Sequence, residues 1–490
     1  MNWTPELALA LALVVPLIGG VGVVVFGNMP NLREAATLIS AVVLAVIVAW
    51  LVEIAPSQPE VELIEFAPGL SLAFKLEPLG AVFAMVASGL WIVNSLFSIG
   101  YMRGNKEKDQ TRFYLCFTIA IASAMGIALA GNLLTLFFFY EALTLSTYPL
   151  VAHKGDAKAR KGASIYLGIL LTTSIGLLLP AVFAVWYFAG TTDFVAGGIL
   201  SGAVSVTTGG ILLLLFAFGI GKAALMPVHP WLPNAMVAPT PVSALLHAVA
   251  VVKAGVFTML KVSTYTFGPE FMRELPMADA LAWVAGISIV LASVIAMTKD
   301  NLKARLAYST VSQLSYITLG AMLATPIALL GAAVQIVMHA FGKITLFMTA
   351  GAIYTGTKKT EISQLDGLGR YMPATFIAFT IGALSIIGLP PFGGVWAKLF
   401  LMEGATAAGQ PWLMAMLIAS TILNIGYLLP VAFRAFFRKG PAESPMKPGL
   451  PPLLAVAAPV ITAIGTIALF FAIGPLVDYL EPVFTTEMRP

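Results

Sequence analysis

Long apolar runs recur through nearly the whole chain, and they constrain its fold more than any other feature of the sequence. We count fourteen segments of about 20 apolar residues, the length a helix needs to cross a bilayer. Short turns at Gly131-Asn132 and Thr325-Pro326 divide two adjoining pairs. Of the 490 residues, 59% are hydrophobic and only 10% are charged, and a soluble domain of this length could not hide so much apolar surface. The sequence predicts an all-α polytopic membrane protein with about 14 transmembrane helices.

The distribution of basic residues predicts the orientation of these helices. If the N-terminus lies outside, the cytoplasmic loops hold 19 lysines and arginines, and the opposite loops hold four, Lys75, Lys261, Arg273 and Arg489. This asymmetry is what the positive-inside rule demands. We therefore expect a multi-pass protein of a prokaryotic plasma membrane with both termini outside. The first run, at about residues 7–26, follows a segment without basic residues, so we interpret it as a retained helix rather than a cleaved signal.

Five charged residues fall inside the predicted helices: Glu141, Lys222, Lys253, Lys343 and Lys398. A charge at the centre of a membrane helix costs at least ~2.5–3.5 kcal/mol on insertion scales, and such residues mark functional sites by default. Structural alternatives remain open for each. Glu141 could form a purely structural ion pair, Lys343 could pair without transferring a proton, and Lys222 could reach water at the membrane surface.

The predicted seventh helix is interrupted. Its apolar run meets Lys222 and is then broken by prolines at positions 227, 230 and 233. A further helix restarts after prolines 239 and 241 and carries His247 and Lys253. Proline removes a backbone donor and clashes with the preceding turn. Broken backbone at membrane depth persists only where protein buries it or where it lines a watery cavity. The sequence therefore places Lys222 beside an ion path.

A second interruption, in the predicted twelfth helix, repeats this pattern. Glycines and prolines break residues 381–403, and Lys398 follows one turn later. Paired interruptions of this kind are typical of inverted-repeat transporters. We predict two inverted five-helix repeats, helices 4–8 and 9–13. The corresponding units are residues 1–111 with helices 1–3, residues 112–265 and 266–440 with the two repeats, and residues 441–490 with helix 14 and the tail.

No motif indicates a cofactor. The sequence has no glycine-rich phosphate loop, CxxC pair or HExxH motif. The single cysteine, Cys116, excludes an internal disulfide and makes a cysteine-based metal site a poor fit. We predict no bound cofactor, no resident metal and no nucleic-acid partner.

Several long motifs resemble one family. The run HPWLPNAMVAPTPVSALLHAVAVVKAGVF is similar to the signature of the antiporter-like subunits of respiratory complex I and of Mrp-type cation/proton antiporters. The segments SIGYMRGNKEKDQTRFY, FFFYEALTLSTYPL and GLPPFGGVWAKLFL match the same family, so the resemblance extends from about residue 79 to 436. It implies proton-transfer roles for a glutamate, three lysines and two histidines: Glu141, Lys222, Lys253, Lys398, His247 and His339. The charge count adds Lys343 as a further candidate for proton transfer.

The chemistry of these groups suggests a path. Burial disfavours an ammonium ion and a nearby carboxylate favours it, so Glu141 would hold a proton on Lys222 until the two separate. The proton would pass to Lys253 through water and His247, then by way of His339 and Lys343 to Lys398. His339 and Lys343 are four residues apart and share a helix face. His247 and Lys253 are about 120° apart on an ideal helix, so water or local unwinding must bridge them. Hydroxyls flanking Glu141, at Tyr140, Thr144, Thr147 and Tyr148, could orient water or could be packing contacts.

Two kinds of complex fit the resemblance. The sequence is most like the D-type subunit of an Mrp antiporter, which exchanges protons for Na⁺ or another monovalent cation with other membrane subunits. The alternative is an M- or N-type proton-pumping subunit of NADH:quinone oxidoreductase or of a membrane-bound hydrogenase. A third hypothesis is that the chain is a free-standing carrier that needs no partner subunits. Because only Glu141 is a deep carboxylate, and a Na⁺ site would need several oxygen ligands, we expect the chain to move protons and its partners to select the cation.

Overall fold

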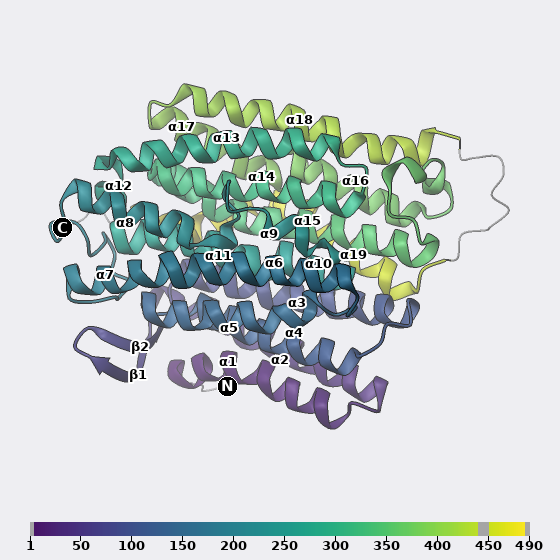
Figure 1. Ribbon diagram of the computed structural model, residues 1–490, viewed down its shortest axis with the longest axis horizontal. Helices are drawn as coiled ribbons and strands as arrows, with labels where there is room; N and C mark the ends of the chain where they lie inside the picture. Colours follow the sequence, from purple (N-terminus) through teal and green to yellow (C-terminus); the bar gives the residue numbers. More distant parts are fainter. Residues whose placement is uncertain (1–3, 440–449, 486–490) are drawn as a thin grey trace.

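The computed structural model is a bundle of long, roughly parallel helices (Figure 1). It describes residues 4–439 and 450–485, apart from the side chain of His247. The first part of the chain contains α1 Pro5–Val25, α2 Pro30–Ile54, β1 Glu60–Ala67, β2 Leu70–Lys75, α3 Pro78–Gly104, α4 Gln110–Ala128, α5 Leu133–Val151, α6 Ala157–Thr173, α7 Leu179–Ala189, α8 Val206–Gly219, α9 Trp231–Asn234, α10 Thr240–Ala244, α11 Val251–Lys261 and α12 Pro269–Glu274. The second part contains α13 Pro276–Thr298, α14 Leu302–Leu323, α15 Pro326–Thr357, α16 Pro373–Ile387, α17 Gly394–Ala407, α18 Pro411–Phe437, α19 Leu453–Phe471 and α20 Ile473–Thr485.

Local sequence explains where several of these helices begin. The Asn132 side chain accepts the Thr135 N–H at 2.8 Å and caps α5, which satisfies one of the free donors of a first turn. Thr325 caps α15 in the same way, and proline opens α15 as it opens α2, α3, α13, α16 and α18. Proline suits this position because its missing N–H would be unbonded there. The predicted turns at Gly131-Asn132 and Thr325-Pro326 are thereby confirmed.

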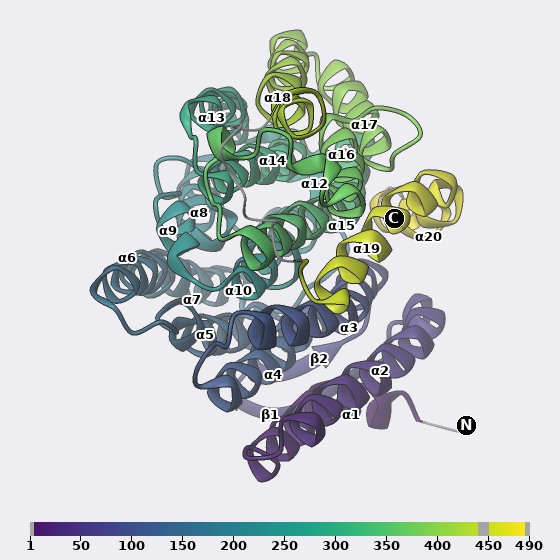
Figure 2. The ribbon, with the colours of Figure 1, turned by 90° about the vertical axis from the view of Figure 1, so that its right-hand side faces the viewer.

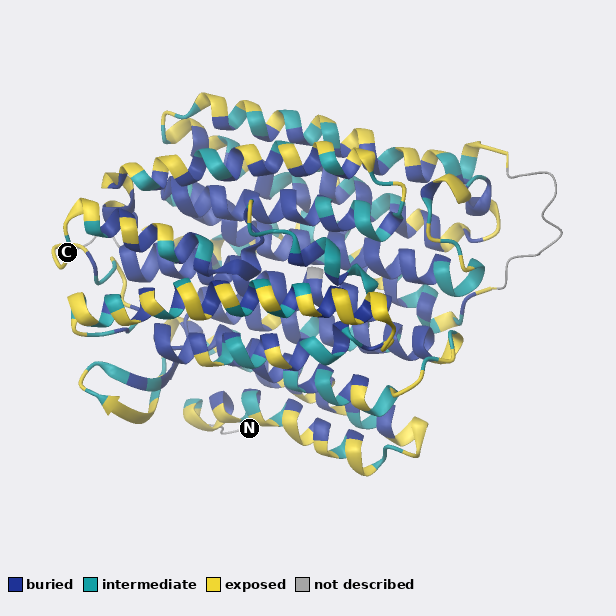
Figure 3. Cartoon of the chain, in the orientation of Figure 1, coloured by how far each residue is buried: buried dark blue, intermediate teal, exposed yellow. Residues whose placement is uncertain are grey.

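Helix α15 is the axis around which the bundle packs. It contacts α14, α16, α17, α19 and α3. Of the residues in its most apolar 18-residue stretch, 89% are buried inside the protein. By contrast, only 33–39% of the residues are buried in the most apolar stretches of α1, α2, α18 and α19. Helices α1 and α2 lie at one edge of the bundle (Figure 2). Exposed residues gather on the outer helices and buried ones fill the middle of the bundle (Figure 3). Many of the exposed side chains are large and hydrophobic, such as Val21, Ile39 and Phe433, as expected of a surface that faces lipid.

The predicted fold class is confirmed, with two qualifications. Ten helices of the described residues are long and apolar enough to span a membrane. The other predicted spans correspond to α14 and to the interrupted sets α8, α10–α11 and α16–α17, so the count of fourteen stays a prediction. A two-stranded antiparallel hairpin, β1–β2, follows α2, and the prediction of a purely helical chain missed it. Its first strand carries Glu60, Glu62 and Glu65, all of them exposed.

Both predicted interruptions are confirmed. Helix α8 ends at Gly219 and is followed by a 3₁₀ turn, Gly221–Ala223, before the proline-rich connection to α9. Helix α16 ends at Ile387, and α17 begins only at Gly394. The helix with His247 and Lys253 is interrupted as well, because a π-helical segment, Leu245–Val249, separates α10 from α11. Such π segments are rare and concentrate at functional sites.

Candidate functional site

Lys222 lies on the 3₁₀ turn that follows α8, fully buried against α5. Its Nζ donates to the carbonyl oxygen of Tyr140 at 2.7 Å and to the Thr144 hydroxyl at 2.6 Å. The ammonium position is also 3.1 Å from the centre of the Tyr140 ring, where a cation is attracted by the π face. Three groups of one helix therefore hold the side chain of Lys222.

The backbone of this first interruption is satisfied by side chains rather than by a helix. The Lys222 N–H donates to the Tyr140 hydroxyl at 3.0 Å, and the Trp231 indole donates to the Gly221 carbonyl at 2.9 Å. Since an unpaired backbone group in a membrane costs several kcal/mol, these two aromatic residues stabilise the open turn. Tyr166 packs edge-on against Trp231 and supports it.

Glu141 lies next to this site without contacting the lysine directly. Among the residues that the structure describes, no salt bridge joins Glu141 to Lys222. Glu141 is half-buried, and both of its carboxylate oxygens are buried without a hydrogen-bond partner in the described part of the chain. A carboxylate in that position is an uncompensated acceptor, one residue from the Tyr140 carbonyl that binds Lys222.

Lys253 and His339 are in direct contact. The two residues come from α11 and α15, both are buried, and Lys253 Nζ lies 2.6 Å from His339 Nδ1. At that distance a proton must lie between the nitrogens, and either residue can be its donor. The predicted link between Lys253 and His247 cannot be read in the same way, because the His247 side chain lies outside the described residues. The backbone around position 247 is π-helical, from Leu245 to Val249, and the link itself stays a prediction.

Lys343 starts a continuous line of side-chain contacts. Its Nζ donates to the Ser309 hydroxyl of α14 at 2.6 Å, and the Tyr427 hydroxyl of α18 donates to the same Ser309 oxygen at 2.8 Å. The Tyr427 hydroxyl also lies 2.5 Å from the side-chain amide of Asn424. Oriented with its oxygen toward α17, that amide accepts from Lys398 Nζ at 3.2 Å. This orientation satisfies the amide and is the one we adopt.

Lys398 lies at the second interruption and closes the line. Its Nζ donates to the Ile387 carbonyl at 2.8 Å, the last carbonyl of α16, and to the Thr421 hydroxyl at 3.1 Å. The ring of Tyr316 lies 5.3 Å from the same nitrogen. A free helix C-terminus carries partial negative charge, so the end of α16 is a natural partner for an ammonium group. Gly388 makes this turn with a φ of +85°, a conformation that glycine adopts without strain.

The structure places six of the seven predicted residues in three clusters inside the bundle: Glu141 beside Lys222, Lys253 with His339, and Lys343 joined to Lys398. The side chain of the seventh, His247, is not described. Sequence reasoning missed Ser309, Asn424 and Tyr427. An amide inside an apolar run was the available signal for Asn424, since polar groups at membrane depth are costly. A serine and a tyrosine carry no comparable signal.

One prediction about a basic residue was wrong. The charge count places Lys261 in an outside loop, but it is the last residue of α11 and is fully buried. Its Nζ forms an ion pair with Glu77 at 3.3 Å and donates to the Ala130 carbonyl at 2.7 Å. Glu77 also caps α3, by accepting the N–H groups of Leu79 and Gly80. The error arose because the polar residues 263–266, which form a buried π-helical segment, look like the start of a loop.

The arrangement can relay protons. Lysine, histidine, serine and tyrosine each have a proton to give and a lone pair to accept one in at least one protonation state. Hydrogen-bonded chains of such groups inside a membrane are typical of proton relays. The geometry therefore describes a membrane bundle with buried clusters of polar and charged groups.

The comparisons with known proteins agree with this class. Residues 130–425 match the NADH:quinone oxidoreductase/Mrp antiporter transmembrane family, and the chain belongs to that family. It is 31% identical over 392 residues to "NADH-quinone oxidoreductase subunit N" of Desulforudis audaxviator, covering 78% of this chain and 77% of the relative. It is 28% identical over 459 residues to "NAD(P)H-quinone oxidoreductase chain 5" of Synechocystis, covering 86% of this chain and 65% of the relative.

A further relative is named as an antiporter. The chain is 30% identical to a Rhizobium meliloti protein whose name describes it as the A/B component of a probable K(+)/H(+) antiporter, over 78% of this chain and 38% of that protein. Among solved structures, the Mrp complex from Dietzia superposes with a TM-score of 0.83 and 27% identity, covering 98% of this chain and 52% of the other. Complex I from Thermus thermophilus superposes with a TM-score of 0.81 at 20% identity over 98% of both chains, which shows the common fold.

Proposed function

We propose that this chain is a proton-translocating subunit of a multisubunit membrane complex, and that protons move along the buried line from Lys222 to Lys398. The observation that carries the proposal is the unbroken set of contacts Lys343, Ser309, Tyr427, Asn424 and Lys398, which links α15 to the second interruption. A structural role alone would not require two further helices, α14 and α18, to present hydroxyl and amide groups to two buried lysines.

In the proposed mechanism, Lys222 takes up a proton while Glu141 is charged nearby and releases it toward Lys253 when that influence is removed. Lys253 passes the proton across its 2.6 Å contact to His339. His339 and Lys343 lie one turn apart on α15, so water can join them. From Lys343 the proton travels through Ser309 to Tyr427. The Asn424 amide orients Tyr427 and Lys398 but does not itself carry a proton, so water completes the transfer to Lys398, which exchanges the proton with one bulk phase.

For the complex, we propose the monovalent cation/proton antiporter, in which this chain moves protons and its partner subunits bind Na⁺ or another cation. The high structural overlap with the Mrp complex supports this assignment. The relatives named as quinone oxidoreductase subunits support a second candidate, a proton-pumping subunit of a redox complex. The same lysines would serve both, so the difference lies in what drives Lys222 and Glu141 apart. Both candidates are consistent with a plasma-membrane location and with the basic ends of the helices facing the cytoplasm.

The path is tested by removing its first charges. We expect Glu141→Ala and Lys222→Ala each to abolish proton-coupled transport, a loss of about 10²-fold or more, as for removal of a proton-transfer group. Transport is measured in everted vesicles with a pH-sensitive dye, and membrane content is measured by immunoblot. Lys106→Ala, in a loop outside the helices, is the matched control and should transport normally. Near-normal transport in either test variant, at normal abundance, would refute the proposed path.

The partner assignment is tested by mild-detergent purification from native membranes followed by mass spectrometry. Small hydrophobic subunits without flavin or iron–sulfur proteins, together with cation-driven proton release, would support the antiporter. Copurifying flavin, iron–sulfur or nickel subunits would assign the chain to a redox-driven pump. Recovery of the chain alone would contradict both assignments.

A further inference from the structure

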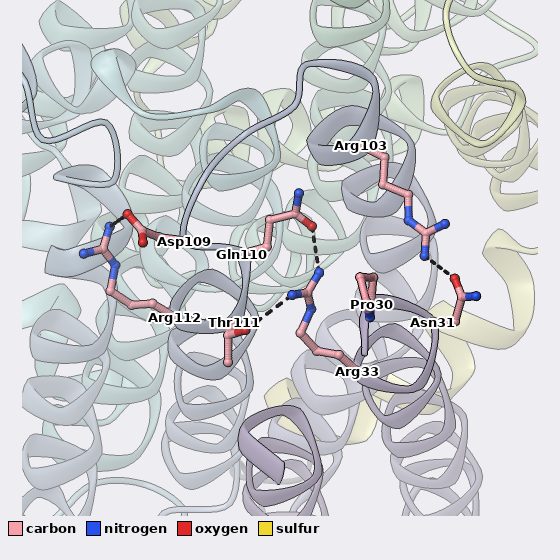
Figure 4. Close-up of a pocket in the computed structure, with 8 residues that line it drawn as sticks. All are labelled: Pro30, Asn31, Arg33, Arg103, Asp109, Gln110, Thr111 and Arg112. Carbon is pink, nitrogen blue, oxygen red and sulfur yellow. Dashed lines mark hydrogen bonds and ion pairs between the residues drawn. The ribbon is translucent and has the colours of Figure 1, made fainter. Parts of the chain in front are cut away.

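A basic cavity of about 880 Å³ lies far from the lysine path, where the α1–α2 turn meets the α3–α4 connection. Its walls are the first turns of α2 and α4 and the last turn of α3, and Figure 4 shows three arginines around it. The lining residues are Pro30, Asn31, Arg33, Arg103, Asp109, Gln110, Thr111 and Arg112. By charge distribution, this end of the bundle is the one predicted to face the cytoplasm.

Arg33 forms the floor of the cavity. Its side chain is only 6% exposed, and its guanidinium donates to Gln110 at 2.8 Å and to Thr111 at 3.3 Å. The Nε–H of the same group is buried and has no partner among the described residues. A guanidinium stays charged in proteins, so Arg33 places a fixed positive charge beneath the cavity.

The two other arginines are positioned at the rim. Arg103 is 46% exposed; it pairs with Glu34 and donates to Asn31 at 2.7 Å. Arg112 is 49% exposed, and its contact with Asp109 is long, at 3.5 Å. Three guanidinium groups therefore face two carboxylates, which leaves one positive charge. Guanidinium groups bind phosphate oxygens in a bidentate way.

Two helix N-termini add to this positive potential. Neither α2, with 25 residues, nor α4, with 19, has a side-chain hydrogen bond at its N-cap. Pro30, the first residue of α2, has no N–H, so the N–H groups at the cavity wall are those of Asn31 in α2 and of Gln110 and Thr111 in α4. A helix N-terminus carries a partial positive charge and binds anions through these N–H groups. Two of them converging with three arginines make a site for a phosphate group.

The surface beside the cavity favours a lipid as the source of that phosphate. The last turn of α1 and the start of α2 expose Val24, Val25, Met29 and Leu32, which are 46–69% accessible. This apolar strip continues along the outer face of α1 through Val21 and Ile18. An amphipathic ligand would satisfy both surfaces at once, with its acyl chains on α1 and its headgroup in the cavity. Basic pockets at the cytoplasmic ends of membrane helices bind anionic headgroups in this way.

We propose that this cavity binds the phosphate headgroup of an anionic phospholipid, with Arg33 and the N-termini of α2 and α4 as its floor and Arg103 and Arg112 as its rim. The site is independent of the proton path, so its failure would leave that proposal untouched. Asp109 limits the affinity, because its carboxylate competes with the phosphate for Arg112.

The test is native mass spectrometry of the purified complex after titration with phosphatidylglycerol or with phosphatidylethanolamine. We expect phosphatidylglycerol to bind more tightly. Arg112→Gln should weaken its binding about fivefold, since one basic residue contributes about 1 kcal/mol to such attraction. Asp109→Asn should strengthen it. Arg160→Gln, which removes an exposed arginine outside the cavity, is the control and should bind as the parent protein does.

Three results would overturn the proposal. The first is equal binding of the two lipids with no effect of Arg112→Gln. The second is full competition by millimolar inorganic phosphate, which would show a site for a small free anion. The third is photo-crosslinking from position 112 to a copurifying protein instead of to lipid, which would show that the cavity is a contact with a partner protein.

Discussion

The two interrupted helices carry the same element, a lysine beside open backbone, but they surround it differently. At the first interruption, Lys222 has one carbonyl, one hydroxyl and one aromatic face as partners, all from α5, and a carboxylate stands nearby without touching it. At the second, Lys398 has the free C-terminus of α16, a hydroxyl and an amide from α18. No carboxylate of the described residues pairs with it.

In the proposed mechanism, this difference gives the two interruptions different tasks. The charge of Glu141 can change the proton affinity of Lys222 strongly if the two move closer or farther apart, because the Coulomb term is steep at short range. The fixed dipoles around Lys398 cannot vary in this way, and a continuous hydrogen-bonded line joins that lysine to Lys343. The first interruption is therefore suited to control proton transfer, and the second is suited to conduct it.

A glycine lies at a close backbone approach at each interruption, Gly255 at the first and Gly394 at the second. A Cβ at Gly255 of α11 would collide with the backbone of Lys222 and Ala223. Because backbone cannot move aside as a side chain can, Gly255→Ala should displace the turn and cost at least about 1–3 kcal/mol. We expect the largest effect of any variant here, with little folded protein by size-exclusion chromatography and no transport.

Gly168→Ala in α6 is the matched control, since a Cβ there would meet no atom within 4 Å. That variant should behave as the parent protein does. Full folding and transport in Gly255→Ala would mean that the position of Lys222 tolerates a shift, and the contrast between a fixed and a movable lysine would have to be abandoned.

The proposed proton transfer between Lys343 and Lys398 should fail when a single hydroxyl is removed. Tyr427→Phe removes the group that bridges Ser309 and Asn424 and leaves the ring in place. We expect proton transport to fall about 10²-fold, with folding retained. Tyr479→Phe removes a hydroxyl that bonds to α2, remote from the lysines, and should leave transport unchanged. A similar small loss in both variants would show that water, and not this tyrosine, carries the proton.

The sequence predicted the charged members of the path and not the groups that connect them. Lys222, Lys253 and Lys398 stand out because a charge within an apolar run is costly enough to demand a reason. Ser309 and Tyr427 do not, because small hydroxyls and aromatic residues are common packing residues between membrane helices. Their role depends on which helices meet, and the meeting of α14 with α18 is a property of the tertiary structure.

Features of the fold that depend on local sequence could be predicted in the same way, whereas those that depend on tertiary packing could not. Proline and glycine determine both interruptions, since they act on their own backbone. The burial of Lys261 could not be predicted, because its partner Glu77 lies in a distant part of the chain and caps another helix. The direction of Lys222 was equally hidden: the pairing with Glu141 looks natural in sequence, whereas the adjacent carbonyl of Tyr140 accepts its hydrogen bond.

Two threonines, one at each interruption, allow the surroundings of Lys222 and Lys398 to be compared through the loss of a single hydroxyl. Thr144 accepts from Lys222 at 2.6 Å and Thr421 accepts from Lys398 at 3.1 Å. Among the described residues, Lys222 then keeps one other hydrogen-bond acceptor, the Tyr140 carbonyl, while Lys398 keeps a helix C-terminus and an amide. Thr144→Val should therefore lower transport about fivefold, in line with roughly 1 kcal/mol for one lost hydrogen bond, and Thr421→Val at most about twofold. Each variant is the control for the other in the same vesicle assay. The reverse order would show that the second lysine, held by fixed dipoles, is the more sensitive of the two, and the control of proton transfer would then belong to α16 and α17.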